Sequence, residues 1–368
     1  MRVPAGDLKV QTQAIRAEID AAVREVLDSG WFILGRQLEQ FEAEFAAYHG
    51  LPHCVGVGSG MEALHLALVA LGIGPGDEVI TVPTTAAATV CAIQFAGATP
   101  VFADIDPGTF TMDPGSAASR ITPRTRALLP VHLYGQMADV RALVDLARCH
   151  GLALVEDCAQ AHGARLNGEL AGTVGEIGCF SFYPTKNLGA LGDAGALVTR
   201  DAALAERLRM LRNYGERPDR RYHHAIPGYN SRLDEIQAAI LRVKLRHLDA
   251  WNRRRREIAA WYGSHLQNPA LTLPSARPGA DHVWHLYVPR CRERDALRAH
   301  LAELGVGTQI HYPVPLHLQE ASAALGLGPG HCPEAERAAA EVLSLPIYPE
   351  LTEAQLRHVA GAVNAFRP

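Results

Sequence analysis

The feature that most constrains the fold of this 368-residue chain is an alternation of short apolar runs with longer helical patterns between Cys54 and Cys158. The apolar runs are CVGVG, EVITV, PVFADI, ALLPVHL and ALVEDC, and helical patterns cover residues 60–71, 86–96 and 139–150. Such alternation is typical of right-handed βαβ units. The sequence therefore predicts an α/β fold around a mainly parallel sheet.

Helical periodicity also flanks this region. Residues 11–29 and about 38–48 predict two helices of an N-terminal arm, and a long helix is expected from near Arg232 past Trp251 to Tyr262. The segment PSARPGAD then separates a tail that predicts strands over 282–290 and 308–312 and helices over 294–305 and 335–345. We expect two domains, a large α/β domain with its arm over residues 1–250 and a small α+β domain over residues 251–368.

Composition narrows the class of protein. The chain is 48% hydrophobic and 20% charged, with a net charge of −4, so its overall charge does not favour nucleic acid or an anionic membrane. Four consecutive arginines at 253–256 would fan around a helix rather than form one basic stripe. No stretch approaches about 20 apolar residues, and the N-terminus lacks the apolar core of a signal peptide. Seven cysteines without a C-x-x-C pair favour a reducing cytoplasm and predict neither disulfides nor a metal site.

The strongest candidate for chemistry is Lys186, within CFSFYPTKNLGALGDAGALV. A lysine becomes a nucleophile when desolvation or nearby positive charge promotes loss of its proton. Ser181, Thr185 and Asn187 surround it and could position the oxygens of a phosphorylated ring, and Asp157 ends a buried strand upstream. This arrangement suits a lysine that holds an aldehyde cofactor as an imine.

A second candidate is the turn Gly58-Ser59-Gly60-Met61, which lies between an expected strand and helix. Free amides at a helix N-terminus favour a phosphate. Many such glycines serve only packing, so the turn by itself leaves both readings open. It lacks the G-x-G-x-x-G spacing of a dinucleotide site, which disfavours a nicotinamide-dependent sugar oxidoreductase.

Several motifs, taken together, resemble one family. They are GVGSGMEALHLAL at 56–68, VEDCAQAHGA at 155–164, the Lys186 stretch, GYNSRLDEIQAAIL at 228–241 and IHYPVPLHLQ at 310–319. In this order they are similar to the DegT-type sugar aminotransferases, a branch of the fold-type-I pyridoxal phosphate (PLP) enzymes. The resemblance runs from about Leu38 to the C-terminus. It implies a seven-stranded-type, mainly parallel sheet, a smaller C-terminal α+β domain, PLP as cofactor, and a homodimer with shared active sites.

The resemblance also implies roles for individual residues. Lys186 would carry the cofactor and the migrating proton, and Asp157 would hold the pyridine nitrogen protonated. The other implied cofactor contacts are Gln160 to the ring hydroxyl, and Gly58, Ser59, Gly60, Ser181 and the partner chain's Asn230 to the phosphate. The implied substrate contacts are Tyr183, Arg232, His311 and Tyr312, with Arg232 supplied by the partner chain.

Other readings of these residues remain open from sequence. Asp157 could be a helix N-cap, as could Ser231, and Tyr183 could serve packing alone. His162 is expected to pack beneath the ring or to support Asp157. Glu156 should point to the opposite face of the strand. Many relatives place an aromatic residue over the cofactor ring where this chain has Ala86 or Ala87, so no stacking residue is predicted.

The implied reaction moves an amino group from L-glutamate to a nucleotide-linked keto sugar. The phrase YPTKNLGALGDAGA is closer to members that act on 3-keto sugars, which favours a dTDP-3-keto-6-deoxyhexose over a 4-keto sugar. Lys186 disfavours a sugar dehydratase of the same fold, which carries histidine at that position. The other alternative is a non-catalytic PLP-binding regulatory protein, which would need an attached DNA-binding region or a lost lysine.

Overall fold

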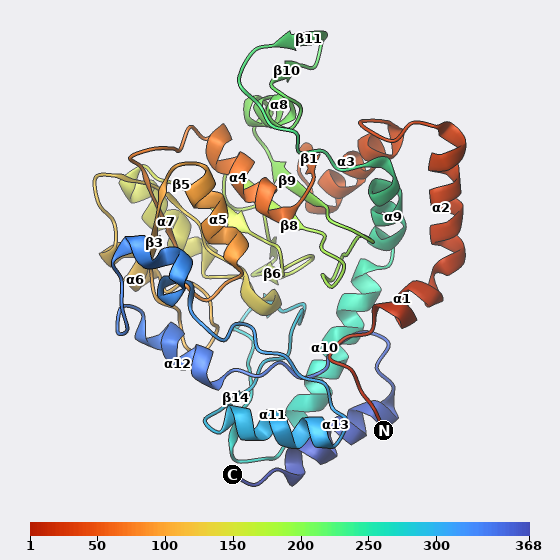
Figure 1. Ribbon diagram of the computed structural model, residues 1–368, viewed down its shortest axis with the longest axis vertical. Helices are drawn as coiled ribbons and strands as arrows, with labels where there is room; N and C mark the ends of the chain where they lie inside the picture. The colour runs from red at the N-terminus through yellow and green to blue at the C-terminus, as the bar shows by residue number, and fades with distance from the viewer.

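A seven-stranded sheet forms the centre of the computed structural model, which describes all 368 residues (Figure 1). In spatial order its strands are β1 (His53–Val57), β9 (Gly195–Thr199), β8 (Ile177–Ser181), β5 (Ala153–Asp157), β4 (Thr125–Leu128), β2 (Glu78–Thr81) and β3 (Thr99–Phe102). Only β9 runs against its neighbours β1 and β8, and the other pairs are parallel. The predicted mainly parallel sheet is confirmed.

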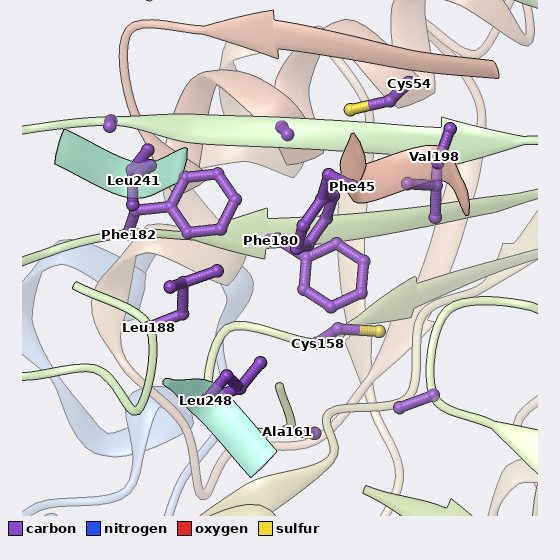
Figure 2. Close-up of a cluster of buried hydrophobic side chains, with 14 of the residues drawn as sticks. Phe45, Cys54, Cys158, Ala161, Phe180, Phe182, Leu188, Val198, Leu241 and Leu248 are labelled. Atoms are coloured by element: carbon purple, nitrogen blue, oxygen red, sulfur yellow. The ribbon is translucent and has the colours of Figure 1, made fainter. Parts of the chain in front are cut away.

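Helices cover both faces of this sheet because alternate strand residues point to opposite sides. Val55, Val57 and Cys179 lie in one buried cluster with α4 (Gly60–Ala70), α5 (Ala87–Phe95) and α8 (Ala202–Leu211). Cys54 and Phe180, their neighbours along the strands, lie in another cluster with α3 (Arg36–His49) and α9 (Glu235–Leu245), which Figure 2 shows. A third cluster joins the sheet to α6 (Pro114–Ser119) and α7 (Val140–His150).

The N-terminal arm differs slightly from the prediction. Its first helical segment is divided at Ile15 into α1 (Leu8–Ala14) and α2 (Arg16–Ser29). Helix α2 packs along α9, and Ile15 and Ile19 bury themselves there against Ile240 and Val243 (Figure 1). The arm is therefore fixed to the main body.

The long helix expected from Arg232 to Tyr262 is two helices. Helix α9 starts only after Asp234, whose carboxylate accepts a hydrogen bond from the Gln237 amide, and it ends at Leu245. Helix α10 (Leu248–His265) follows a break at residues 246–247. On α10 the four arginines fan around the axis as predicted, and Arg255 is buried, where it donates to three backbone carbonyls.

The C-terminal part packs α11 (Arg294–Glu303), α12 (Pro333–Glu341) and α13 (Glu353–Ala365) around short extended segments. The strands predicted over 282–290 and 308–312 are wrong. Tyr287 forms only an isolated bridge to Leu345, and Gln309 forms one to Ser344. The nearby regular strands are β12 (Leu271–Thr272) and β14 (Arg290–Cys291), each of two residues. Trp284, with a φ of 46°, cannot continue an extended strand. A buried cluster of this part includes Val3 of the N-terminus.

The remaining elements are short. Strands β6 (Arg165–Leu166), β7 (Glu169–Leu170) and β13 (Ala280–Asp281) form a small sheet, and β10 (Glu216–Arg217) and β11 (Arg220–His224) form a hairpin that projects from the body (Figure 1). The 3₁₀ turns are η1 (Leu133–Gly135), η2 (Leu316–Leu318) and η3 (Glu320–Leu325). Among the helices, none has the length and apolar character needed to cross a membrane.

Candidate active site

The carboxyl ends of β1, β5 and β8 meet at one edge of the sheet, where α/β proteins bind ligands. A cavity of about 300 Å³ lies there. It is lined by Ser59, Gly60, Thr85, Ala86, Thr89, Asp157, Ala159, Gln160, Ser181, Tyr183, Lys186 and Asp193, among others. The structure thus brings together predicted residues from three separate parts of the chain, and Thr85, Ala86 and Thr89 add a fourth part.

Lys186 lies in the loop after β8, where its amide donates to the Tyr183 carbonyl. Burial lowers the pKa of its amine to about 8, and the charge of Asp157 partly opposes that shift. A substantial fraction of the amine is therefore unprotonated slightly above neutral pH, as a nucleophile requires. Lys186 also lines a second cavity, of about 240 Å³, with Thr185, His311 and Arg255.

Asp157 is the last residue of β5 and is only 4% exposed. Its Oδ2 accepts a hydrogen bond from the Thr89 hydroxyl at 2.9 Å, and its Oδ1 accepts one from the Ala159 amide at 3.1 Å. Burial raises the pKa of this carboxyl, although these bonds and Lys186 oppose the rise. No helix follows β5, so the N-cap reading is wrong. The carboxylate can instead stabilise a cation in the cavity.

Thr89 and Tyr134 are contacts that the sequence alone did not reveal. Thr89 is held in turn by the Thr85 hydroxyl at 2.9 Å. The Tyr134 amide donates to the Gln160 Oε1 at 2.7 Å, and the Gln160 Nε2 donates to the Tyr312 hydroxyl at 3.2 Å. These two hydrogen bonds fix the Gln160 side chain, and one N–H of its amide group remains free to donate. The threonines of TTAAAT at 84–89 indicate a polar segment in the sequence. That Thr89 contacts Asp157 depends on the tertiary fold.

The turn Gly58-Ser59-Gly60-Met61 leads from β1 into α4, as expected. Ser59 caps α4, and its hydroxyl accepts a hydrogen bond from the Glu62 amide. A Cβ at Gly60 would collide with the Ser181 side chain, so only glycine allows this close approach. Gly58 differs, because its amide donates to the Ser231 hydroxyl and it does not line the cavity. The α4 N-terminus and Ser181 remain available to an anion.

Two polar residues do not point into the cavity. Asn187 is buried among Asn252, Val283 and His285 and lines neither cavity, so its expected contact with ring or phosphate oxygens is wrong. His162 has no hydrogen-bond partner at either ring nitrogen and packs against Phe180 and Phe182. Burial lowers the pKa of His162 to about 3, which leaves it neutral and makes it a packing residue.

The residues expected to contact the substrate lie in different places. Tyr183 is 53% exposed at the cavity edge. His311 lies in the second cavity, where its Nδ1 is 2.8 Å from the Ser344 hydroxyl, and burial lowers its pKa to about 4. Asn230 and Arg232 lie outside both cavities of their own chain. Asn230 is exposed, and Arg232 donates to the Asn213 Oδ1.

Glu156 shows why strand alternation matters. It points away from the cavity, as predicted, and its carboxylate accepts hydrogen bonds from the amides of Gly172, Val174 and Gly175. His132 Nε2 lies 2.9 Å from the same carboxylate. His132, Glu156 and Cys158 are close enough to suggest a metal site, but these bonds already occupy the carboxylate.

We therefore expect Glu156→Ala to destabilise the fold by about 3–5 kcal/mol, since it removes one partner of a buried pair. Burial by itself would raise the pKa of the Glu156 carboxyl. The hydrogen bonds from His132 and from the backbone amides have the larger effect and lower this pKa below the ordinary 4.5. This stabilisation is complete above pH 4.5 and is lost as pH falls through the lower folded-state value. Urea unfolding at pH 7 measures the loss. The exposed Glu18→Ala serves as control, and an equal, small effect in both variants would contradict the prediction.

The sequence profile of the DegT/DnrJ/EryC1/StrS aminotransferase family matches residues 13–364. The chain belongs to this family. It is 54% identical, over 99% of this chain and 100% of the relative, to the erythromycin biosynthesis sensory transduction protein EryC1 of Saccharopolyspora erythraea. It is also 54% identical, over 99% and 96%, to the dTDP-3-amino-3,4,6-trideoxy-alpha-D-glucose transaminase of Streptomyces venezuelae.

Among solved structures, DesV of S. venezuelae in complex with a ketimine intermediate superposes with a TM-score of 0.96. It is 55% identical, and the similarity covers 99% of this chain and 98% of DesV. The predicted fold class and aminotransferase family are thereby confirmed. In this chain Lys186, Asp157 and Gln160 lie around one cavity.

Proposed function

We propose that this aminotransferase uses PLP to move an amino group from L-glutamate to a nucleotide-linked keto sugar, a dTDP-3-keto-6-deoxyhexose. The observation that carries the proposal is an amine of lowered pKa, Lys186, in the same cavity as the buried carboxylate of Asp157. The dTDP-sugar is supported by the transaminase of S. venezuelae, which is 54% identical. The 4-keto sugar remains the alternative substrate class.

The residues present fit PLP. Ser59, Gly60 and Ser181 would hold its phosphate at the α4 N-terminus, Gln160 its ring hydroxyl and Asp157 its ring nitrogen. When bound, PLP supplies an electron sink for the carbon that loses its proton. Lys186 can bind the aldehyde and then carry that proton, because burial leaves part of its amine unprotonated. Ala86 and Ala88 line the cavity with small side chains, and no aromatic residue of α5 lines it.

The test is the visible absorption spectrum of the purified protein with added PLP and then L-glutamate. An imine band that glutamate converts to the pyridoxamine form supports the first half of the reaction. Turnover of a 3-keto but not a 4-keto dTDP-sugar would support the acceptor. A folded protein without a band would contradict the PLP assignment. A band that no amino donor changes would favour the regulatory alternative, to which the name of EryC1 also points.

Thr89→Val should weaken PLP binding roughly tenfold to a hundredfold, because a hydrogen bond to a buried charged carboxylate is lost. The dissociation constant is measured by absorbance titration. Thr85→Val is the matched control, since it leaves the Thr89–Asp157 bond in place and should have a smaller effect. Equal affinities for wild type and Thr89→Val would remove Thr89 from the site.

We further propose a homodimer in which Asn230 and Arg232 reach the partner's site, since neither lines a cavity of its own chain. Asn230→Ala should then lower PLP affinity and activity. Mixing it with Lys186→Ala should restore activity to one site per mixed dimer, because that site takes both functional residues. Confirmed mixed dimers without any recovered activity would contradict a shared site.

The domain division near residue 250 stays a proposal, supported by a separate buried cluster that contains residues of α10, α11 and α13 together with Val3. A reducing cytoplasm is likewise proposed, supported by seven cysteines that are all free.

A further inference from the structure

Asn187, which follows Lys186 in sequence, is 2% exposed, and its side chain makes three hydrogen bonds. Its Nδ2 donates to the Asn252 Oδ1 at 2.9 Å and to the Val283 carbonyl at 3.0 Å. Its Oδ1 lies 3.0 Å from the His285 Nδ1. The side chain therefore uses both of its amide protons and one lone pair of its oxygen away from the cavity that its neighbour Lys186 lines.

The proton positions in this network are fixed by chemistry. The Val283 carbonyl can only accept, so the Asn187 group that faces it must be the amide nitrogen. The Asn187 oxygen then faces His285, whose Nδ1 must carry a proton to donate to it. Burial, with the nearby charge of Lys186, holds the pKa of His285 well below its ordinary value, so the ring is neutral. One tautomer and one amide orientation satisfy every contact.

The network joins three parts of the chain. Asn252 belongs to α10, and its Nδ2 also donates to the His162 carbonyl at 2.8 Å, in the turn that follows Asp157. His285 and Val283 belong to the segment that leads into the C-terminal part. The loop of Lys186 and the turn of Asp157 are thus tied to the same asparagine of α10.

We propose that Asn187, Asn252 and His285 are positioning residues that fix the Lys186 amine relative to the Asp157 carboxylate and link both to the C-terminal part of the chain. The inference rests on the proposed function in that Lys186 is the reacting amine. A displacement of about 1 Å at a reacting group can cost a hundredfold in rate. A loosened loop would also admit water to an amine that burial now keeps partly unprotonated.

The test measures the Lys186 amine itself in the full chain freed of PLP. The sequence contains only three lysines, Lys9, Lys186 and Lys244, so acylation rates at a series of pH values can be assigned by mass spectrometry. The charged or titratable groups that act on the Lys186 charge or line its two cavities all remain in Asn187→Ala. They are Asp7, Asp157, His162, Tyr183, Asp193, Arg255, His285, His311, Tyr348 and Glu350. We expect this variant to raise the apparent pKa of Lys186 by about one unit, toward the ordinary value.

Asn268→Ala is the matched control. Asn268 is also buried, and it makes three hydrogen bonds, to the Val363 and Phe366 carbonyls and from the Ala270 amide, far from Lys186. It should lose stability like Asn187→Ala but leave the Lys186 titration unchanged. An unchanged titration in Asn187→Ala, or an equal shift in both variants, would overturn the proposal.

A second pair of variants applies if Asn187→Ala does not fold. His285→Ala removes the donor to Asn187, whereas His285→Asn places an amide nitrogen near the position of Nδ1 and should restore the wild-type titration. A shift of the apparent Lys186 pKa in His285→Ala that is reversed in His285→Asn supports the network. No shift in His285→Ala would overturn the proposal. Since PLP takes no part in this measurement, failure of the proposed function would show separately, as a missing visible band in the wild type.

Discussion

Lys186→Ala should lower aminotransferase turnover by at least about a thousandfold, because one change removes both the amine that binds the aldehyde and the group that carries the proton. No other amine can replace it, since Lys186 is the only lysine that lines either of the two cavities. The measurement is product formation from the keto sugar and L-glutamate. The visible band of the wild type with PLP should also be lost.

Borohydride reduction of the PLP-loaded wild type should attach the cofactor covalently to Lys186 alone among the three lysines. Lys244 is the matched control, because it is also buried and its pKa is likewise lowered to about 8, but its amine donates to the Gly189 carbonyl. Lys244→Ala should keep the visible band even if the fold is less stable. Substantial remaining turnover in Lys186→Ala would reject Lys186 as the reacting amine.

Asp157→Asn should leave the fold intact and reduce activity roughly a hundredfold to a thousandfold. The asparagine oxygen can still accept a hydrogen bond from the Ala159 amide, and its amide nitrogen can donate to the Thr89 hydroxyl, so local packing survives. The variant loses the negative charge that would hold a protonated ring nitrogen, and removal of one partner of a buried ion pair costs about 3–5 kcal/mol. Steady-state kinetics measure the loss of activity, and thermal unfolding measures whether the fold is intact.

Glu156→Gln is the matched control for Asp157→Asn. The two carboxylates are adjacent on β5 and both buried, but Glu156 faces His132 and the backbone of residues 172–175. Its loss should lower stability and leave turnover per folded molecule nearly unchanged. Wild-type rates in Asp157→Asn would remove Asp157 from the mechanism. An equal loss of turnover in both variants would show that strand integrity, and not the ring contact, matters.

Local pattern predicted the part of the fold that carries the site. Apolar strands followed by amphipathic helices have only a few ways to bury both faces, so the sheet and the position of Asp157 at a strand end followed from the sequence. The tail was less predictable, because the apolar residues of 282–290 are buried by loop packing. The strand pattern there is broken at Trp284, which stacks on His282.

The same distinction holds within the site. Lys186, Asp157, Gln160 and Ser181 were predicted from motifs that resemble the family, and each motif consists of residues close together in the chain. Asn187 shows the limit of that reasoning. Its neighbourhood in sequence suggested the cofactor, but its partners lie 65 and 98 residues away and draw it to the opposite side of the loop.

The sequence by itself determined the class of fold and the family and predicted the reacting groups, because these depend on periodicity and on motifs of neighbouring residues. Only the tertiary structure decided which polar side chains face the cavity and which hold the loops behind it. Thr89 binds Asp157 from α5, and Asn252 of α10 binds both Asn187 and the turn after Asp157. Such contacts join residues far apart in the chain, and no local pattern specifies them. They depend on how the helices pack onto the sheet, which the whole chain decides together.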